Sequence, residues 1–500
     1  MPRGGGAVNR FGLGVLGLAI CAGAGLAIAQ LLGPDPPSPY YYLLPVMAAT
    51  LLVVPAYLGG SRDPLSPALI FAVIFTVYYI LRPLRILSSG TMGPAKAAYD
   101  IPIAPVMDSI RVALVLASIG IASFFLGYIA SVRSQPAGSA HYGASPWPVI
   151  ARDRFHLATV VAVACVVAFL AFLLLKSGGL AAYLGQIGYR QRTFTNIAFL
   201  TQLSVPVKAV LFVAVLSRRA SQPNRVSWRV IITLGAFAAT ADVFSGGRSN
   251  LIIGTILPAL LIAHYALRPL KARTVLMLGV ALLAIAVSFR VVFRDSQFSG
   301  SSNHSRTSLL QQSYQRPLDA IVGGHDAIAF DSLATLNGAY GSTYARRLGL
   351  TYLDALTFPA PRALWPGKPL GGGNAWFTST YFPAYYGVDH VETSVTLFGE
   401  AEANFGLAGV LLVPALLGIG LAYLYRRTVA SLSAMSILVY ANVAPYAFTL
   451  VRGDTYHSIP SALLATGASL FVFNYCTVRT SAATSRGVAR ATPALGARNI

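Results

Sequence analysis

The residues best suited to acid–base chemistry gather in one stretch, between positions 362 and 406. All three glutamates of the chain lie there: Glu392, Glu400 and Glu402. A partly desolvated carboxylate at a membrane boundary can take a proton from an attacking hydroxyl group. A solvated loop between two membrane helices would carry such charges without chemistry, but the clustering of every glutamate favours a functional site. The same stretch holds further polar and aromatic side chains: Arg362, Trp365, Lys368, Trp376, Asp389 and His390.

Two cations of this stretch, Arg362 and Lys368, lie in a proline-rich segment, 359–369. Proline fixes the backbone, so both cations would be placed for an anion at little entropic cost on binding. The three glycines that follow, at 371–373, predict a mobile segment.

A second candidate anion site is the turn 245–250, which contains two glycines and Arg248. Free N–H groups at the start of a helix, beside an arginine, favour phosphate binding. An ion pair between Arg248 and the preceding Asp242 is the simpler alternative. The last turn, 452–457, offers a similar choice, because Arg452 can bind an anion or pair with Asp454.

Composition excludes an ordinary soluble domain, whose charged fraction is about 25%. Here 55% of the residues are hydrophobic and 11% are charged, and the mean hydropathy is +0.63. Crossing a hydrocarbon core takes about 20 helical residues. Apolar runs of this kind lie near 12–32, 40–59, 66–87, 108–131, 155–175, 203–217, 230–245, 250–267, 274–293, 405–425, 431–450 and 457–475.

These runs predict an all-α, polytopic integral membrane protein with about 12 transmembrane helices. Residues 1–293 would form the N-terminal membrane helices, about nine spans, and 405–478 the C-terminal ones, about three spans. Residues 294–404 would be one large outward-facing, periplasmic loop. Apolar residues recurring through 314–357 suggest short amphipathic helices there, either on the membrane surface as a lid or as plain packing. Residues 479–500 would be a disordered cytoplasmic tail.

A net charge of +21 would suggest nucleic acid in a soluble protein, but here basic residues follow alternate loops. The positive-inside rule then places both termini in the cytoplasm. Arginines on the outward side, taken as a set, favour a bound anion such as a lipid-carrier diphosphate. For each one alone, headgroup contact or pairing with an acid of the long loop is simpler. The set is Arg82, Arg85, Arg190, Arg192, Arg248, Arg294, Arg306, Arg316, Arg346, Arg347, Arg362 and Arg452.

The cysteines lie in apolar runs without metal-ligand spacing, so we expect neither a disulfide framework nor a metal site. The order of several short motifs resembles the O-antigen polymerase family (oligosaccharide repeat-unit polymerases, Wzy-type) of bacterial inner membranes. The motifs are Asp63-Pro64-Leu65-Ser66-Pro67, Leu81-Arg82-Pro83-Leu84, Gly247-Arg248-Ser249, Pro361-Arg362, Trp365-Pro366, Lys368-Pro369, Gly399-Glu400, Asn404-Phe405-Gly406 and Arg452-Gly453-Asp454.

This resemblance implies a glycosyltransferase of the inner membrane that polymerises polyprenyl-diphosphate-linked oligosaccharides on the periplasmic side, without metal, nucleotide or other cofactor. Arg248 and Arg362 would stabilise the leaving diphosphate as its charge develops. Glu400, or in its place His390, would be the base. Glu402 stands where an aromatic residue is expected, which leaves open which glutamate acts. Further substrate contacts would come from Lys368, Arg452, Arg294, Arg190 and Asn404.

The expected partners are the lipid-linked oligosaccharide, membrane lipids, and a chain-length regulator and flippase of the same pathway; no nucleic acid is expected. Two alternatives stay open. A ligase-like enzyme would transfer the same donor to another acceptor. A transporter or flippase of lipid-linked sugars would carry charged residues inside its spans and inverted repeats, whereas most spans here lack buried charge and no repeat is visible.

Overall fold

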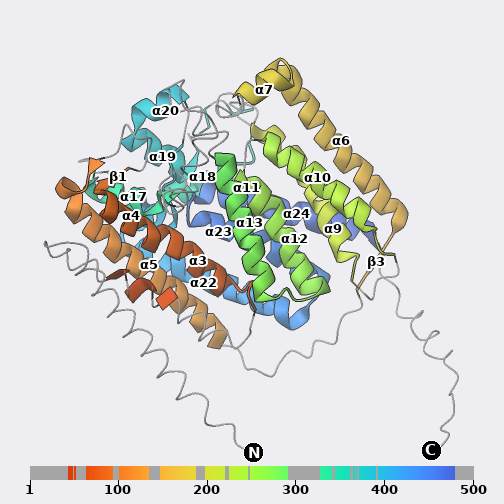
Figure 1. Ribbon diagram of the computed structural model, residues 1–500, viewed down its shortest axis with the longest axis horizontal. Helices are drawn as coiled ribbons and strands as arrows, with labels where there is room; N and C mark the ends of the chain where they lie inside the picture. The colour runs from red at the N-terminus through yellow and green to blue at the C-terminus, as the bar shows by residue number, and fades with distance from the viewer. Residues whose placement is uncertain are drawn as a thin grey trace, which may run out of the picture.

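The computed structural model shows an α-helical protein with two small antiparallel ladders (Figure 1). Only the backbone is described at 132–133, 184–186, 198–199, 248–249, 283–290, 385 and 388–389. The described residues are 43–44, 46–48, 50–51, 63–93, 101–133, 147–186, 198–219, 224–245, 248–290, 322, 327–339, 344–360, 364–365, 367–368, 371–389 and 392–478.

Long apolar helices make up a bundle that carries most of the described chain. The predicted apolar runs from residue 66 onward each fall on these helices. Its members are α3 (Pro67–Thr76), η2 (Val77–Leu81), α4 (Arg82–Ser89), α5 (Met107–Arg133), α6 (Arg152–Ser177), α9 (Val205–Leu216), α10 (Trp228–Phe244), α11 (Arg248–Leu251), η7 (Ile252–Ile256), α12 (Leu257–Ile262), η8 (Ala263–Leu267), α13 (Ala272–Arg290), α22 (Leu407–Ser431), α23 (Ala434–Leu450) and α24 (Thr455–Cys476).

Five helices within the described ranges are long and apolar enough to cross a membrane: Pro67–Ser89, Ala104–Ser131, Arg152–Ser177, Leu407–Ser431 and Thr455–Cys476. Shorter apolar helices accompany them, among them Ala434–Leu450. The predicted α-helical class and membrane character are confirmed at this level. The number of spans stays a prediction, because the first two predicted runs fall largely outside the described residues.

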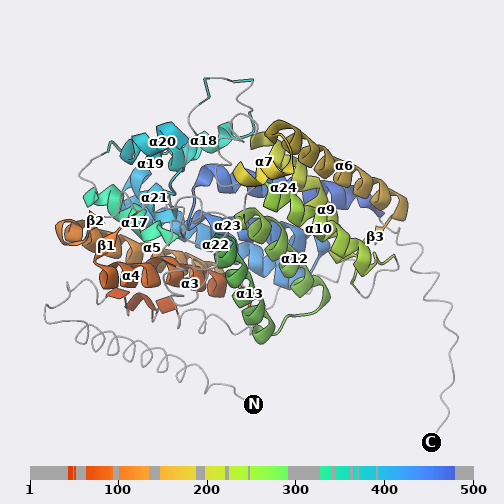
Figure 2. The same cartoon turned by 45° about the horizontal axis from the view of Figure 1, so that its top comes forward.

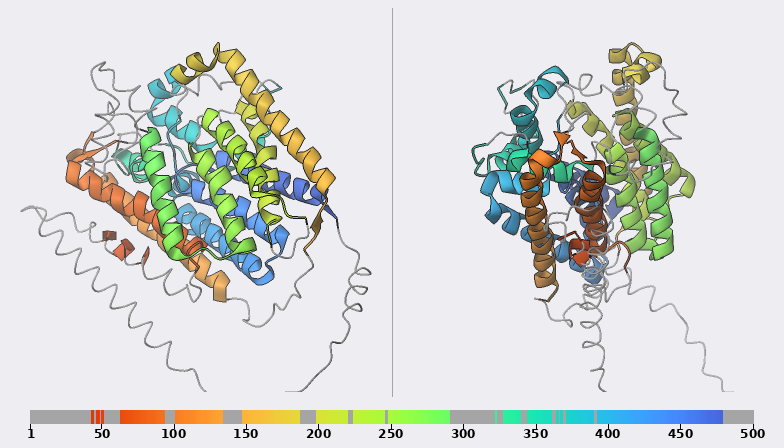
Figure 3. Two further views of the ribbon diagram at one scale, coloured as in Figure 1. Left: turned by 45° about the vertical axis from the view of Figure 1, so that its right-hand side comes forward. Right: turned by 60° about the vertical axis from the view of Figure 1, so that its left-hand side comes forward.

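Small residues let the central helices approach closely. A Cβ atom added to Gly127 of α5 would lie 2.2 Å from the Ala415 carbonyl oxygen of α22, and one on Gly418 would lie 2.2 Å from the Phe124 carbonyl oxygen. Close backbone contact through glycine is typical of helix packing in membranes, where no hydrophobic effect drives helices together. Figure 3 shows α6 at the margin of the bundle. This helix exposes apolar side chains along its length, as a lipid-facing helix does.

One end of the bundle, which we call the basic end, gathers arginines and lysines from alternate loops. There β3 (Val149–Ile150) pairs with β4 (Thr477–Val478), joining the start of α6 to the end of α24. Arg426 Nη1 donates to the Ser131 carbonyl oxygen at 2.6 Å, joining the ends of α22 and α5. This grouping agrees with the positive-inside pattern; which side of a membrane it faces stays a prediction. The basic residues concerned are Arg152, Arg154, Arg218, Arg219, Arg225, Arg229, Arg268, Lys271, Arg273, Arg426 and Arg427.

The opposite end, the site end, carries the short helices between α13 and α22. Figure 2 shows α18, α19 and α20 together at this margin, above α17 and α21. These elements are α17 (Ala329–Ala334), η11 (Thr335–Ala339), α18 (Leu350–Asp354), η12 (Ala355–Thr357), α19 (Gly372–Tyr381), α20 (Pro383–Asp389) and α21 (Leu397–Phe405). Helix α7 (Leu180–Gln186) follows α6, and β1 (Thr91–Met92) pairs with β2 (Ile101–Pro102).

Helix α17 is packing rather than a surface lid. All six of its residues are buried, and it contacts α5 and α21. Its Asp331 binds Arg82 in a two-pronged ion pair, with Nε–Oδ2 at 2.7 Å and Nη2–Oδ1 at 2.6 Å. Arg82, predicted on the outward side as a member of an anion-binding set, is therefore neutralised by an acid of the long segment.

Candidate functional site

The structure describes some of the predicted site residues and leaves others outside the described ranges. Arg190, Arg294, Arg362 and His390 lie outside the described residues. Arg248 begins α11, and only its backbone is described. The remaining predicted residues, Lys368, Glu400, Asn404 and Arg452, all lie at the site end.

Glu400 is a buried acid that ties three elements together. It stands in the first turn of α21, and its side chain is almost wholly shielded, with 2% of the residue exposed. Its Oε1 accepts a hydrogen bond from Thr351 Oγ1 at 2.8 Å. Its Oε2 accepts from the backbone N and from Oγ1 of Thr455, each at 2.8 Å. The carboxyl group thereby joins α21 to α18 and to the start of α24.

Asn404, one helical turn later, orients the partner of Glu400. Its Nδ2 donates to Thr351 Oγ1 at 2.7 Å and to the Glu400 carbonyl oxygen at 2.8 Å, and its Oδ1 accepts from Gly349 N at 2.9 Å. Because the Thr351 hydroxyl oxygen accepts from Asn404, its own hydrogen is directed to Glu400. Asn404 is itself buried, so the geometry makes it a positioning residue for the carboxyl group.

The environment of Glu400 changes its acidity. Burial, followed by the negative charge of Asp454, raises the pKa of the Glu400 carboxyl to about 8, against the lowering effect of the hydrogen bonds from Thr455 and Thr351. A group whose pKa lies near neutrality is suited to proton transfer, and pKa values perturbed in this way concentrate at functional sites.

Asp454 and His457 form a second acid–base pair beside Glu400. Asp454 is the N-cap of α24 and is fully buried, and its Oδ1 lies 2.8 Å from His457 Nδ1 and accepts from the His457 backbone N at 3.2 Å. Its Oδ2 accepts from Asn374 N at 2.9 Å. The alternative in which Asp454 pairs with Arg452 is thus replaced by a pair with His457. Burial by itself raises the pKa of Asp454, but His457 and the backbone donors bring it below its usual value.

Sequence reasoning named His457 only as part of the last turn and did not select it as a site residue. The signal that could have found it is the spacing, because a residue three positions after an N-cap aspartate lies over the capping side chain. We call the connected group the Glu400–His457 network; its members are Glu400, Asn404, Thr351, Thr455, Asp454 and His457.

The three glycines at 371–373 are a tightly fitted support of this network, not the mobile segment that the sequence predicted. Gly371 and Gly372 have φ of 106° and 76°, a region that favours glycine. A Cβ atom on Gly372 would lie 2.2 Å from Tyr456 Cβ and 2.9 Å from Asp454 Oδ2. One on Gly373 would lie 3.0 Å from Glu400 Oε1. Glycine at the start of α19 therefore leaves room for the side chains of Asp454 and Glu400.

Lys368 lies near the start of α24. Its Nζ donates to the Phe358 and Ala360 carbonyl oxygens at 3.2 and 3.0 Å, and lies 5.5 Å from the centre of the Tyr456 ring. The Tyr456 ring centre lies 5.0 Å from that of His457. A predicted phosphate-binding cation and the Asp454–His457 pair therefore flank one aromatic ring, and Lys368 also closes the proline-rich loop.

Glu402, the other glutamate left open by the sequence, belongs to a separate cluster. Tyr344 OH donates to Glu402 Oε2, and the ring of Tyr344 packs edge-on against Trp376 at 5.5 Å between centroids. Burial raises the pKa of Glu402, while the bond from Tyr344 and the charge of Arg346 lower it in part. Between the two glutamates, Glu400 is the one that contacts the start of α24.

Asp242, which one interpretation of the sequence paired with Arg248, has its partners among the described side chains in Lys208 and Thr255. It is buried in α10 and binds Lys208 of α9, with Nζ–Oδ1 at 2.6 Å, while Thr255 Oγ1 donates to its other oxygen at 2.7 Å. This pair puts buried charge on two helices, α9 and α10, of a bundle whose spans were predicted for the most part to lack it.

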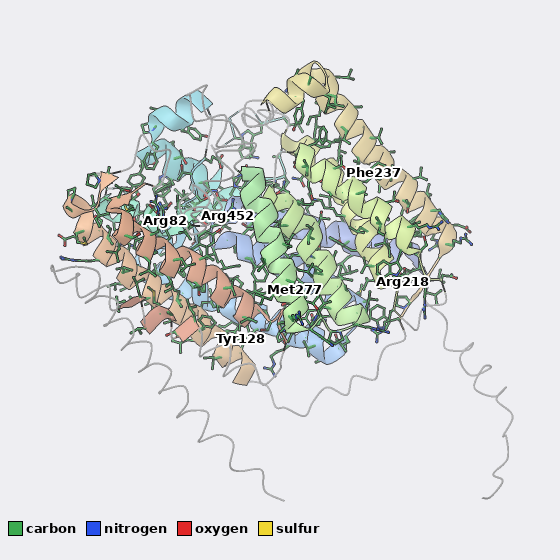
Figure 4. The ribbon with its side chains drawn as sticks, in the orientation of Figure 1. Arg82, Tyr128, Arg218, Phe237, Met277 and Arg452 are labelled. Atoms are coloured by element: carbon green, nitrogen blue, oxygen red, sulfur yellow. The ribbon has the colours of Figure 1, made fainter. Side chains whose placement is uncertain are left out.

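Arg452 follows the end of α23, in the turn that leads to Asp454. Figure 4 shows Arg452 and Arg82 toward the site end, whereas Tyr128 and Arg218 lie toward the basic end. Arg452 is half-buried, and its backbone N donates to the Thr449 carbonyl oxygen at 3.1 Å. The site end thus brings one predicted cation into the turn that carries the network.

Comparison with protein families, curated proteins and solved structures finds no significant match for this chain. The fold and the site define its class as an α-helical protein of membrane character, with a buried acid–base network at one end of its bundle.

Proposed function

We propose that this chain is a membrane glycosyltransferase that polymerises polyprenyl-diphosphate-linked oligosaccharide repeat units at the site end. The observation that carries the proposal is the Glu400–His457 network, in which two acids and an imidazole meet at the start of α24, beside Lys368 and after Arg452. A lipid-linked donor suits a site at the end of a membrane bundle, because its hydrocarbon chain can stay in the bilayer while its diphosphate and sugars reach the network.

In this proposal the reaction is displacement at the first sugar of the donor. A hydroxyl group of the acceptor oligosaccharide attacks the anomeric carbon, the bond to the lipid diphosphate breaks, and the diphosphate leaves with the electron pair. Arg248 and Arg362, with Lys368, Arg452, Arg294 and Arg190 as further cations, stabilise the charge that develops on it. Fixed cations act where charge appears in the transition state. The proton released by the hydroxyl passes to the Glu400–His457 network.

The test is an assay of the purified protein in nanodiscs with a polyprenyl-diphosphate oligosaccharide as donor and acceptor. We expect a ladder of lengthening lipid-linked products from the wild type, and loss of the ladder in Arg362→Ala and Glu400→Gln variants that keep their thermal unfolding temperature. Transfer of a single unit to an added lipid-A core or protein acceptor, without a ladder, would instead identify the ligase-like alternative.

A transporter or flippase of lipid-linked sugars is a second candidate, favoured by the buried Lys208–Asp242 pair. Ionisable residues inside membrane helices often line substrate or ion pathways. The pair lies beside the π-helical segment η7, and such segments are frequent at functional sites. If the wild type forms no glycosidic bond but moves the lipid-linked sugar between leaflets of a vesicle, the transferase proposal fails and the transporter stands.

A further inference from the structure

His457 is the member of the Glu400–His457 network that is open to a substrate. Its side chain is 48% exposed, whereas Asp454 and Glu400 are buried. A large acceptor sugar cannot reach the Glu400 oxygens, which are shielded and occupied by Thr351 and Thr455. The imidazole of His457 is therefore the group of this network that a substrate can contact.

The hydrogen bonds of Asp454 determine which nitrogen of His457 can accept a proton. Asp454 is held by Asn374 N and by the His457 backbone N, so its Oδ1 is fixed 2.8 Å from Nδ1. An ionised carboxylate only accepts hydrogen bonds, so Nδ1 carries the hydrogen. In the neutral imidazole Nε2 then has the lone pair, and it points toward Glu392, whose Oε2 lies 3.8 Å away.

An N-capping role alone does not account for this arrangement. The cap requires the Asp454 carboxylate to accept from the His457 backbone N–H, and any residue except proline supplies that group at position 457. The additional contact to the ring fixes the tautomer and orientation of an exposed imidazole, which capping does not need. A carboxylate that orients a histidine in this way is a recurrent feature of acid–base catalysis.

We propose that His457 is the catalytic base of the glycosyl transfer, and that Asp454 is its positioning residue. This inference rests on the proposed transferase function. His457 Nε2 takes the proton of the acceptor hydroxyl as the oxygen forms its bond to the anomeric carbon and the diphosphate leaves with the electron pair of the broken bond. The imidazolium, stabilised by Asp454, later releases this proton to solvent. Glu400, linked through Thr455, holds the start of α24 in place beneath it.

The first test replaces the imidazole and then returns it. We expect His457→Gln to lower kcat in the nanodisc assay by about 10²–10⁴-fold, the usual contribution of a positioned base, with a much smaller change in KM. His457→Ala should regain part of its activity when free imidazole is added, a response that a purely structural residue would not give. His156→Gln, a histidine exposed at the basic end, is the matched control and should keep wild-type activity.

The second test uses the pH profile of kcat. Among the described residues, the charged groups that act on the imidazole are Asp454, Glu392 and Glu400. Activity should rise with pH as the imidazole loses its proton. Glu392→Gln removes a negative charge that favours the imidazolium, so the midpoint of the rise should move to lower pH by about 1 unit.

These outcomes separate the two proposals. If the wild type forms no product, the transferase function fails. If the wild type forms the ladder while His457→Gln stays within about twofold of it, or the Glu392→Gln midpoint does not move, the function stands and His457 is not the base. Loss of activity in His457→Ala without recovery in imidazole also contradicts the base role, provided that the variant keeps the wild-type unfolding temperature.

Discussion

Two aspartate–histidine pairs lie at opposite ends of this molecule, and they differ in how completely the protein encloses each imidazole. At the basic end, Asp63 Oδ1 lies 3.0 Å from His264 Nε2, and its Oδ2 accepts from Tyr265 OH and Tyr425 OH, each at 2.8 Å. His264 Nδ1 accepts from Leu270 N at 2.9 Å, and the side chain is 6% exposed. At the site end, Asp454 Oδ1 holds Nδ1 of His457, whose Nε2 faces Glu392 at 3.8 Å in a side chain that is 48% exposed.

The comparison shows how the same residue types serve stability in one place and chemistry in another. Both nitrogens of His264 are occupied by protein partners, so this imidazole has no lone pair to offer. Its Asp63 gathers η8, α22 and the turn before α3 into one closed polar contact. The Nε2 atom of His457 lies 3.8 Å from Glu392 Oε2, beyond hydrogen-bond distance. Accessibility of the second nitrogen is the property that separates the two pairs.

The largest expected effect on stability comes from breaking the closed pair. Asp63→Ala leaves His264, Tyr265, Tyr425 and the Leu65 backbone N without their acceptor. Removing one partner of a buried charged contact costs about 3–5 kcal/mol. We expect a large fall in the unfolding temperature in detergent, with kcat per folded molecule unchanged. A loss of kcat in protein that remains fully folded would contradict the purely structural role of this end.

A smaller effect is expected at the glycine that supports the open pair. Gly372→Ala places a Cβ atom against Tyr456 Cβ and Asp454 Oδ2, at a φ of 76°. Overpacking of a tight contact costs about 1–3 kcal/mol, and the displaced Asp454 should lower kcat as well. Gly90→Ala is the matched control, because its φ is 68° and nothing lies within 4 Å of the added Cβ. Equal effects of both substitutions on kcat would show that backbone strain, not contact with the acid, matters.

The smallest expected effect, counted for a single pH unit, is the pH dependence of stability at Glu400. Between pH 5 and 8 the unfolded chain releases the proton of this carboxyl group, whose ordinary pKa is 4.5, while the folded protein, with a pKa of about 8, keeps it. Stability therefore falls as pH rises through this window, by up to about 1.4 kcal/mol per pH unit. Glu400→Gln cannot ionise and should flatten this slope. Unfolding temperatures measured from pH 5 to 8 decide the matter, and an unchanged slope would mean that Glu400 is ionised throughout.

The helices were open to prediction from sequence because membrane helices are encoded locally. A run of apolar residues forms a helix wherever water is absent to satisfy its backbone, so the runs from residue 66 onward fall on helices. The basic loops follow from the same alternation. The position of the short helices in 327–405 was harder to predict. Apolar spacing there does not say whether a short helix such as α17 lies on the surface or in the interior.

The partners of the polar residues were decided by tertiary structure. The sequence singled out Glu400, Asn404 and the turn at 452–457. It did not show that the acids at 400 and 454 would meet through Thr455. Likewise it did not show that Asp331 would take Arg82, or Lys208 would take Asp242. Each of these pairs joins segments far apart along the chain, and residue type alone does not select one cation for one acid.

By itself the sequence determined the class of the protein, the alternation of its basic loops and the stretch in which its acids lie, because hydrophobicity and charge act position by position. Only the tertiary structure decided which acid faces which base, which histidine is closed and which is open, and why three glycines stand at 371–373. Those properties depend on distances of a few ångströms between helices, and such distances are determined when the whole bundle packs.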